Sequence, residues 1–88
     1  MEFDWDDANL KHIARHGIAP EEAEDAVLIE PLEADVQEHG REHRVLCFGR
    51  TRSGRLWTVL YTERRGKIRV VTAYEMSKRQ QRMYVEGK

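Results

Sequence analysis

The sequence predicts an α+β fold in which two N-terminal helices and one C-terminal helix pack on a four-stranded antiparallel sheet. Two observations indicate this class. Before residue 32 the apolar residues recur at helical spacing, whereas residues 32–74 contain four runs rich in Val, Leu, Thr and Tyr, separated by turns at Gly40, Gly54 and Gly66. A chain of 88 residues is long enough for only one core, so we expect a single domain over residues 1–88.

The N-terminal part is expected to be mainly helical. Phe3–Trp5 alternates apolar and polar residues and is expected to form a short strand. An aspartate that precedes Ala8–His16 can cap a first helix over this range, and Gly17 can end it. Pro20 is favoured at the first position of a second helix, which Pro31 stops.

The remaining elements are four strands and a last helix. Connections this short force neighbouring strands to run antiparallel, which gives a meander. The third strand is apolar on both faces and is therefore expected to be central, but the pattern does not show which sheet face is open. A capping box at Ser77 begins the last helix, which extends to about Tyr84. The expected strands are Leu32–Gln37, Arg44–Arg50, Leu56–Glu63 and Lys67–Tyr74.

The net charge of −1 conceals a strong asymmetry along the chain. Residues 1–43 contain 13 acidic and three basic residues, a charge of −10, whereas residues 44–88 contain 12 basic and three acidic residues, a charge of +9. Eleven of the 15 basic residues are arginines, whose planar group suits phosphate oxygens. The asymmetry indicates either a surface that binds a polyanion or two halves that neutralise each other in the folded domain.

The meander places basic residues at both ends of the sheet. The turn at Gly54 and the start of the last helix lie at the same end, and the turn at Gly66 lies at the other. Bases at both ends are suited to following a nucleic-acid backbone. The first end holds Arg50, Arg52, Arg55, Lys78 and Arg79, and the second holds Arg64, Arg65 and Lys67.

Other classes of site have little support in the sequence. The pairs His12/His16 and His39/His43 have the i,i+4 spacing of metal ligands, but a zinc site needs further ligands, so we predict no metal and no other cofactor. No glycine-rich phosphate loop and no nucleophile elbow are present. Cys47, the single cysteine, is expected to be a buried structural thiol in a reducing compartment. No apolar run reaches membrane-spanning length, and we expect a cytoplasmic protein that does not bind membranes.

Arginine, histidine and tyrosine remain as the residues able to perform chemistry. RNA supplies its own nucleophile, the 2′-hydroxyl. Cleavage then requires a base for this hydroxyl, donors for the charge on phosphorus and an acid for the leaving oxygen. These three residue types can supply all of these functions without a metal ion.

Several segments, taken together and in order, resemble the BrnT-type toxins. The opening of the chain matches the F-x-W-D and K-H-G-V motifs of that family, and a match to its S/P-x-E-E-A helix follows. The similarity extends through the sheet to the basic last helix and so covers almost the whole chain. The segments are Phe3–Asp6, Arg15–Ile18, Pro20–Ala23, Phe48–Thr51, Tyr61–Arg64 and Ile68–Ala73.

This resemblance implies a RelE-like ribonuclease toxin of a type II toxin–antitoxin pair, which cuts RNA without needing the ribosome and inhibits translation and growth. It also implies neutralisation by a small BrnA-like antitoxin with a ribbon-helix-helix part, often in a 2:2 complex. Carried over by position, the catalytic candidates are His16, Arg64, Arg69 and Tyr84. The residues expected to bind the RNA backbone are Arg50, Arg52, Arg55, Arg65, Lys78 and Arg79.

Two positions depart from the family pattern. Arg15 stands where lysine is usual, and Tyr74 stands where arginine is common, so a phosphate contact made by that arginine would be lost. His16, beside Gly17, suits a helix C-cap as well as catalysis. Two alternatives to an active ribonuclease therefore stay open. One is a non-catalytic nucleic-acid- or partner-binding module with the same fold, and the other is a basic surface that only seats an acidic antitoxin segment.

Overall fold

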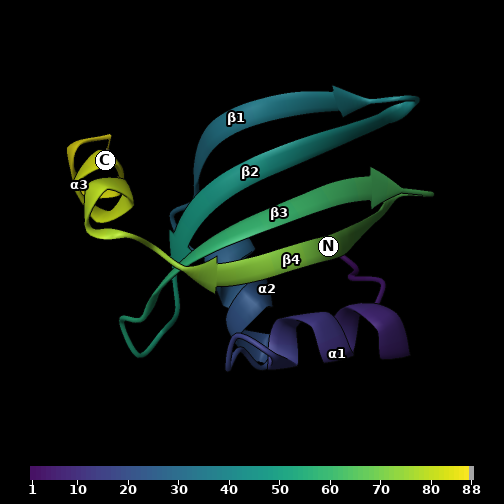
Figure 1. Ribbon diagram of the computed structural model, residues 1–88, viewed down its shortest axis with the longest axis horizontal. Coiled ribbons are helices and arrows are strands. Elements are labelled where there is room, and N and C mark those ends of the chain that lie inside the picture. The colour runs from purple at the N-terminus through teal and green to yellow at the C-terminus, as the bar shows by residue number, and fades with distance from the viewer. Residues whose placement is uncertain (88) are drawn as a thin grey trace.

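The computed structural model, which describes residues 1–87 except for the side chain of His39, confirms the α+β fold. Two helices precede a four-stranded sheet and a third helix follows it (Figure 1). In chain order the elements are α1 (Asp7–Ala14), α2 (Pro20–Leu28), β1 (Leu32–His39), β2 (Glu42–Arg50), β3 (Leu56–Arg64), β4 (Lys67–Glu75) and α3 (Lys78–Glu86).

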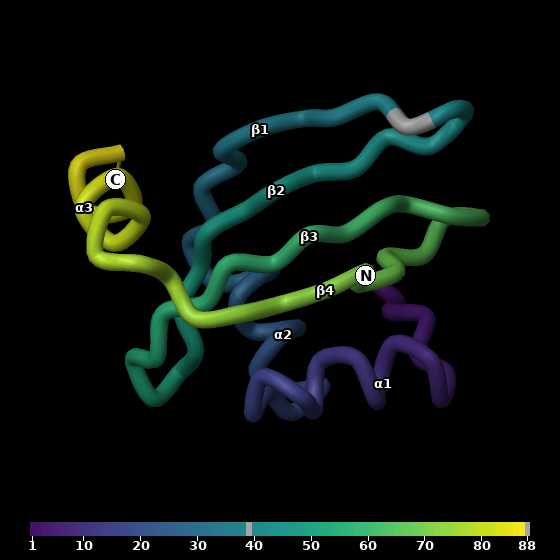
Figure 2. Tube along the Cα trace, in the orientation of Figure 1, coloured from purple at the N-terminus to yellow at the C-terminus, as the bar shows by residue number. Residues whose placement is uncertain are grey.

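The sheet is an antiparallel meander in the order β1-β2-β3-β4. Helices α1 and α2 lie along one face, and α3 lies at the end of the sheet where β4 finishes (Figures 1 and 2). Successive residues of a strand point to opposite faces. Cys47 accordingly packs in the core under α1 and α2, whereas Phe48 packs with Met76 and Tyr84, the cluster that holds α3. The face opposite α1 and α2 is therefore covered only in part.

The main core lies between the sheet and the first two helices. Ile13 and Ala26 are fully buried there against Trp57 and Val59 of the central strand. Gly49 allows the closest approach, because a Cβ at this position would lie 1.8 Å from the Ala26 carbonyl oxygen. Helix α2 thus rests directly on the backbone of β2.

Element boundaries differ modestly from those predicted. Helix α1 ends at Ala14 and not at His16, because the N–H groups of His16 and Gly17 bond to carbonyls three residues back and Gly17 has a φ of 74°. The short strand expected at Phe3–Trp5 is reduced to an isolated parallel bridge between Phe3 and Ile68 of β4, in which the Ile68 N–H donates to the Glu2 carbonyl and the Asp4 N–H donates to the Ile68 carbonyl.

The structure also bears on the single cysteine and on the lengths of the helices. Cys47 is free and buried, and burial raises the pKa of its thiol to about 12, as expected for a structural cysteine. Within residues 1–87 no helix is long and apolar enough to cross a membrane.

Candidate active site

Three neighbouring strands carry a row of polar residues at the end of the sheet near the β3–β4 turn. Arg44 of β2 lies opposite Thr62 of β3, and Thr62 lies opposite Arg69 of β4. Directly opposed residues of antiparallel strands point to the same face, so the two arginines flank Thr62 on one surface. Thr62 is buried and donates its hydroxyl hydrogen to the His43 carbonyl at 2.9 Å, which fixes the centre of the row.

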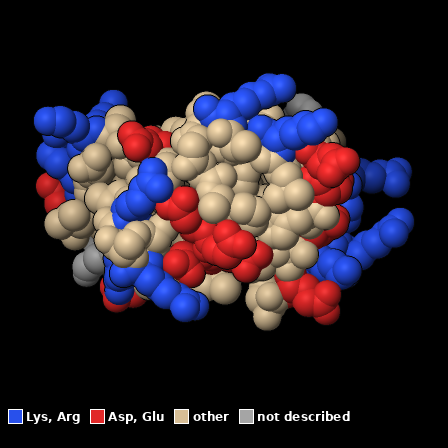
Figure 3. All heavy atoms as spheres, turned by 90° about the horizontal axis from the view of Figure 1, so that it is seen from below, with Lys and Arg blue, Asp and Glu red and all other residues tan. Residues whose placement is uncertain are grey.

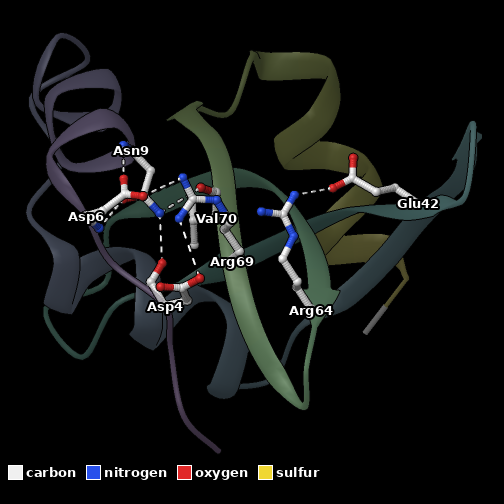
Figure 4. A network of polar contacts seen from close by, with 7 residues as sticks. All are labelled: Asp4, Asp6, Asn9, Glu42, Arg64, Arg69 and Val70. Atoms are coloured by element: carbon white, nitrogen blue, oxygen red, sulfur yellow. Dashed lines mark hydrogen bonds and ion pairs between the residues drawn. The ribbon is translucent and has the colours of Figure 1, made fainter.

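Arg69 is held by the start of the chain (Figure 4). Its guanidinium lies 2.9 Å from the carboxylate of Asp6 and 3.6 Å from that of Asp4, and its side chain is only 18% exposed. Asp6 also caps α1 by accepting the Asn9 N–H, and this bond, with a smaller contribution from Arg69, lowers the pKa of the Asp6 carboxyl. Asn9 in turn donates to the carbonyls of Asp4 and Val70. These contacts fasten the N-terminus of α1 to β4.

Arg64 and Arg44 share one carboxylate, that of Glu42. Arg64 donates to Glu42 at 2.8 Å, and a nitrogen of Arg44 lies 3.5 Å from its other oxygen. The hydrogen bond from Arg64 lowers the pKa of Glu42 below its ordinary value. The Nε of Arg44 is buried and has no hydrogen-bond partner among the described residues. The protein therefore satisfies the donors of Arg44 only in part.

These groups surround a cavity of about 260 Å³, which we call the arginine cavity. His12 of α1 also lines it, so the cavity combines three arginines, one histidine and one carboxylate. Its size and chemistry suit a phosphate group, because guanidinium forks bind phosphate oxygens in pairs and histidine and carboxylate can exchange protons. The lining residues are Ala8, Asn9, His12, Glu42, Arg44, Thr62, Arg64, Arg69, Val70 and Val71.

Of the four catalytic candidates predicted from the sequence, the structure brings Arg64 and Arg69 together at this cavity. His16 lies one helical turn beyond His12 and contacts the ring of Tyr74, with ring centroids 6.4 Å apart. Tyr84 lies in α3, where it is 5% exposed and donates its hydroxyl hydrogen to the Glu30 carbonyl at 2.8 Å. Because α3 is at the other end of the sheet, Tyr84 does not reach the arginine cavity.

The arginines near the β2–β3 turn are paired with acidic residues of the first half. Arg55 lies 2.8 Å from Glu22, Arg50 lies 3.0 Å from Glu30, and Arg52 lies 3.5 Å from Asp25. Viewed from the side of α1 and α2, acidic side chains gather centrally between basic ones at both ends (Figure 3). Many bases are thus neutralised by the acidic half, while basic clusters still stand at the ends, where polyanion binding stays a prediction.

The other three predicted RNA-binding residues occupy separate places. Lys78 and Arg79 stand in the first turn of α3, where the helix N-terminus adds positive potential. Arg65 stands in the β3–β4 turn and lines a second hollow with Asp4, Arg64 and Lys67. Helix α3 reaches β3 at Thr58, whose hydroxyl donates to Gln80 at 3.2 Å, and at about 3.3 Å per residue Thr58 lies ~13 Å along the strand from Thr62 of the arginine cavity. Residues at both ends therefore touch one ligand only if that ligand is long.

Sequence reasoning missed Arg44, Glu42 and His12 as members of this site. The i,i+4 pair His12/His16 was the available signal for His12, although it was interpreted only as a possible metal pair. No group of three or more His, Cys, Asp or Glu residues in the described part of the chain is arranged to hold a metal ion. The side chain of His39, half of the other histidine pair, lies outside the described residues.

A model of the family "ribonuclease toxin, BrnT, of type II toxin-antitoxin system" matches residues 5–80. The chain belongs to the BrnT family. Membership confirms the resemblance noted from the sequence and implies an RNA target and an antitoxin partner for this BrnT-family chain. Searches of curated proteins and of solved structures found no match, so the RelE-like fold stays a prediction. The arginine cavity lies entirely within the matched range.

Proposed function

We propose that this BrnT-family chain is a metal-independent endoribonuclease that cuts RNA in the arginine cavity. The observation that supports this most directly is the convergence of Arg44, Arg64 and Arg69 with His12 and Glu42 around a space of about 260 Å³. Such a site contains donors for a charged phosphate and two groups able to transfer protons.

The proposed reaction uses the nucleophile of the RNA itself. The 2′-oxygen attacks the adjacent phosphorus while its proton passes to one of the two groups Glu42 and His12, and the other group, in its protonated form, gives its proton to the leaving 5′-oxygen. The P–O5′ bond breaks as the 2′-O–P bond forms, which leaves a 2′,3′-cyclic phosphate and a 5′-hydroxyl. Arg64 and Arg44 stabilise the charge that develops on the phosphate oxygens.

Arg69 has a different task in this proposal. Asp4 and Asp6 already neutralise it, so it contributes less free charge than Arg64, which is 54% exposed. It fixes the wall of the cavity by joining β4 to the start of α1. The backbone of the RNA would continue towards Arg65, and a longer substrate would reach Lys78 and Arg79 in α3, together with Arg50, Arg52 and Arg55 once phosphates exchange with their carboxylate partners.

The biological setting is part of the same proposal. Cleavage of cytoplasmic RNA would inhibit translation and growth until an antitoxin blocks the site. We expect this partner to be a BrnA-like ribbon-helix-helix protein that forms a 2:2 complex. Family membership supports an antitoxin of some kind, and the basic ends of the sheet offer an acidic segment of such a protein complementary charge.

The test is cleavage of a labelled single-stranded RNA by purified protein, without ribosomes and with EDTA. Arg64→Gln should reduce the rate by about 10²–10³-fold, the usual effect of removing one donor to a developing charge. His12→Ala should reduce it by about 10²–10⁴-fold. Arg41→Gln removes an exposed arginine of the β1–β2 turn that neither lines the arginine cavity nor belongs to the proposed RNA-binding residues, and it serves as the matched control. Unchanged cleavage in the Arg64 and His12 variants would refute the assignment.

One observation favours a second candidate. Arg64 and Arg69 are both engaged by carboxylates, as they would be in a domain whose charges serve its own fold. Such a non-catalytic module would shift the RNA on a gel with strong salt dependence and yield no fragments. The same assay therefore separates the two functions.

A further inference from the structure

Seven aromatic residues occur in the chain, and Tyr74 differs from the others in its surroundings. Phe3, Trp5, Phe48, Trp57, Tyr61 and Tyr84 all belong to one of the two buried clusters or pack against it. Tyr74 belongs to neither cluster of the described residues and is only half-buried, on the edge strand β4. Its ring contacts the exposed ring of His16 at a centroid distance of 6.4 Å. An aromatic ring outside the core has a face on which a nucleic-acid base can stack.

A β-bulge aligns Tyr74 with the arginine cavity. Tyr61 lies opposite Val70 and Leu60 lies opposite Thr72, so that Val71 is one extra residue in β4. Arg69 and Tyr74 are five positions apart and would point to opposite faces of a regular strand. With the bulge, the partners of Arg69 and Tyr74 are Thr62 and Thr58, which share one face of β3. Arg69 and Tyr74 therefore face the same side of the sheet.

A second set of rings leads from the cavity to the same place. His12 lines the cavity, and its ring lies 6.3 Å from that of His16, which in turn contacts Tyr74. Tyr74 stands three residues beyond Val71 of the cavity wall, or ~10 Å along the strand. At about 3.4 Å per stacked nucleotide, this distance corresponds to about two or three nucleotides.

We propose that the ring of Tyr74, bordered by the ring of His16 at an interplanar angle of 58°, forms a stacking platform for an unpaired base of the RNA, about two or three nucleotides from the phosphate in the arginine cavity. This inference rests on the proposed function and extends it to the class of substrate. Stacking of the base on the Tyr74 ring requires it to be free of a pairing partner, so the substrate is single-stranded at this position. Because every base has a face that can stack, the platform should add affinity for the RNA without selecting one type of base.

The experiment begins with an RNA oligonucleotide that has one cut site, mapped with the wild-type protein. Abasic nucleotides are then placed singly at each of about three positions on either side of the cut. At one of these positions the abasic nucleotide should raise KM by about five- to 150-fold, which corresponds to the stacking energy of a single base, with little change in kcat. Tyr74→Ala should raise KM for the complete RNA by a similar factor. Tyr74→Phe keeps the ring and should behave like the wild type.

The combination of variant and abasic substrate is decisive. If Tyr74 stacks on that base, Tyr74→Ala and the abasic change together raise KM no more than either change alone. The proposal is overturned if no abasic position raises KM, if the two changes multiply, or if Tyr74→Phe loses as much as Tyr74→Ala. The abasic series on the wild-type protein needs no variant and so decides the question even if Tyr74→Ala does not fold. An RNA that is not cut at all refutes the proposed function instead.

Discussion

Replacing Tyr84 with phenylalanine distinguishes a structural role from a catalytic one. The hydroxyl of Tyr84 donates to the Glu30 carbonyl at 2.8 Å, and burial raises the pKa of the phenol. Removing this hydrogen bond should lower the free energy of unfolding by about 1 kcal/mol. For a domain of this size that lowers Tm by about 4–8 °C. Cleavage of RNA at 25 °C should be unchanged, because Tyr84 lies at the other end of the sheet from the arginine cavity.

The expected loss of stability is too small to be mistaken for the loss of a catalytic group. A domain of 88 residues is expected to have a stability of about 4–13 kcal/mol, so a loss of about 1 kcal/mol leaves nearly all molecules folded. A missing general acid would instead reduce kcat by about 10²–10⁴-fold. Thermal melts by circular dichroism and cleavage rates on the same preparations measure both quantities. A large fall in kcat with an unchanged Tm would refute the structural role and restore the catalytic assignment of Tyr84.

Three further changes test the frame of the site. Gly49→Ala should lower stability by about 3 kcal/mol or more, because the new methyl group meets the Ala26 carbonyl and forces α2 off the sheet; an unchanged urea midpoint would contradict this packing. Asn9→Ala removes the bonds that fasten α1 to β4 and should lower stability by about 2 kcal/mol, which thermal melts would detect. Glu42 has a folded-state pKa below its ordinary 4.5, so its paired carboxylate stabilises the fold above that pH and this contribution is lost as pH falls through the lowered pKa. In Glu42→Gln the free energy of unfolding should therefore fall less steeply as the pH is lowered. Urea unfolding at a series of acidic pH values measures this, and the same pH dependence as in the wild type would show that the pair contributes nothing.

The elements of the fold follow from local patterns, and the sequence was sufficient to predict them. Turn glycines, the capping box at Ser77 and the change from helical to strand periodicity depend on a few adjacent residues. All four strands were found to within two residues at each end. Errors occurred where a tertiary contact decides the outcome. The apolar and polar residues of Phe3–Trp5 alternate as in a strand, yet only one bridge to β4 forms there.

The site was only half predictable because it depends on strand register. Arg44 and Arg69 are 25 positions apart and meet through Thr62, and a shift of one residue in either pairing would have turned them to different faces. The bulge at Val71 has no glycine or other local signal that marks it. Tyr84 was instead placed in the site only because it matches a family position, and such a match does not show which end of the sheet the residue occupies.

The acidic half of the chain holds Arg64 and Arg69 with different strength, which matters for the proposed chemistry. Arg64 and Glu42 form a pair that is open to solvent, and such pairs contribute little to stability because water and salt screen them. A phosphate can therefore take the place of the Glu42 carboxylate at little cost, which frees Glu42 to accept a proton beside the attacking 2′-hydroxyl. Arg69, at 18% exposure and between two carboxylates, is much harder to release. The same acidic half thus holds one arginine in place and leaves another available to the substrate.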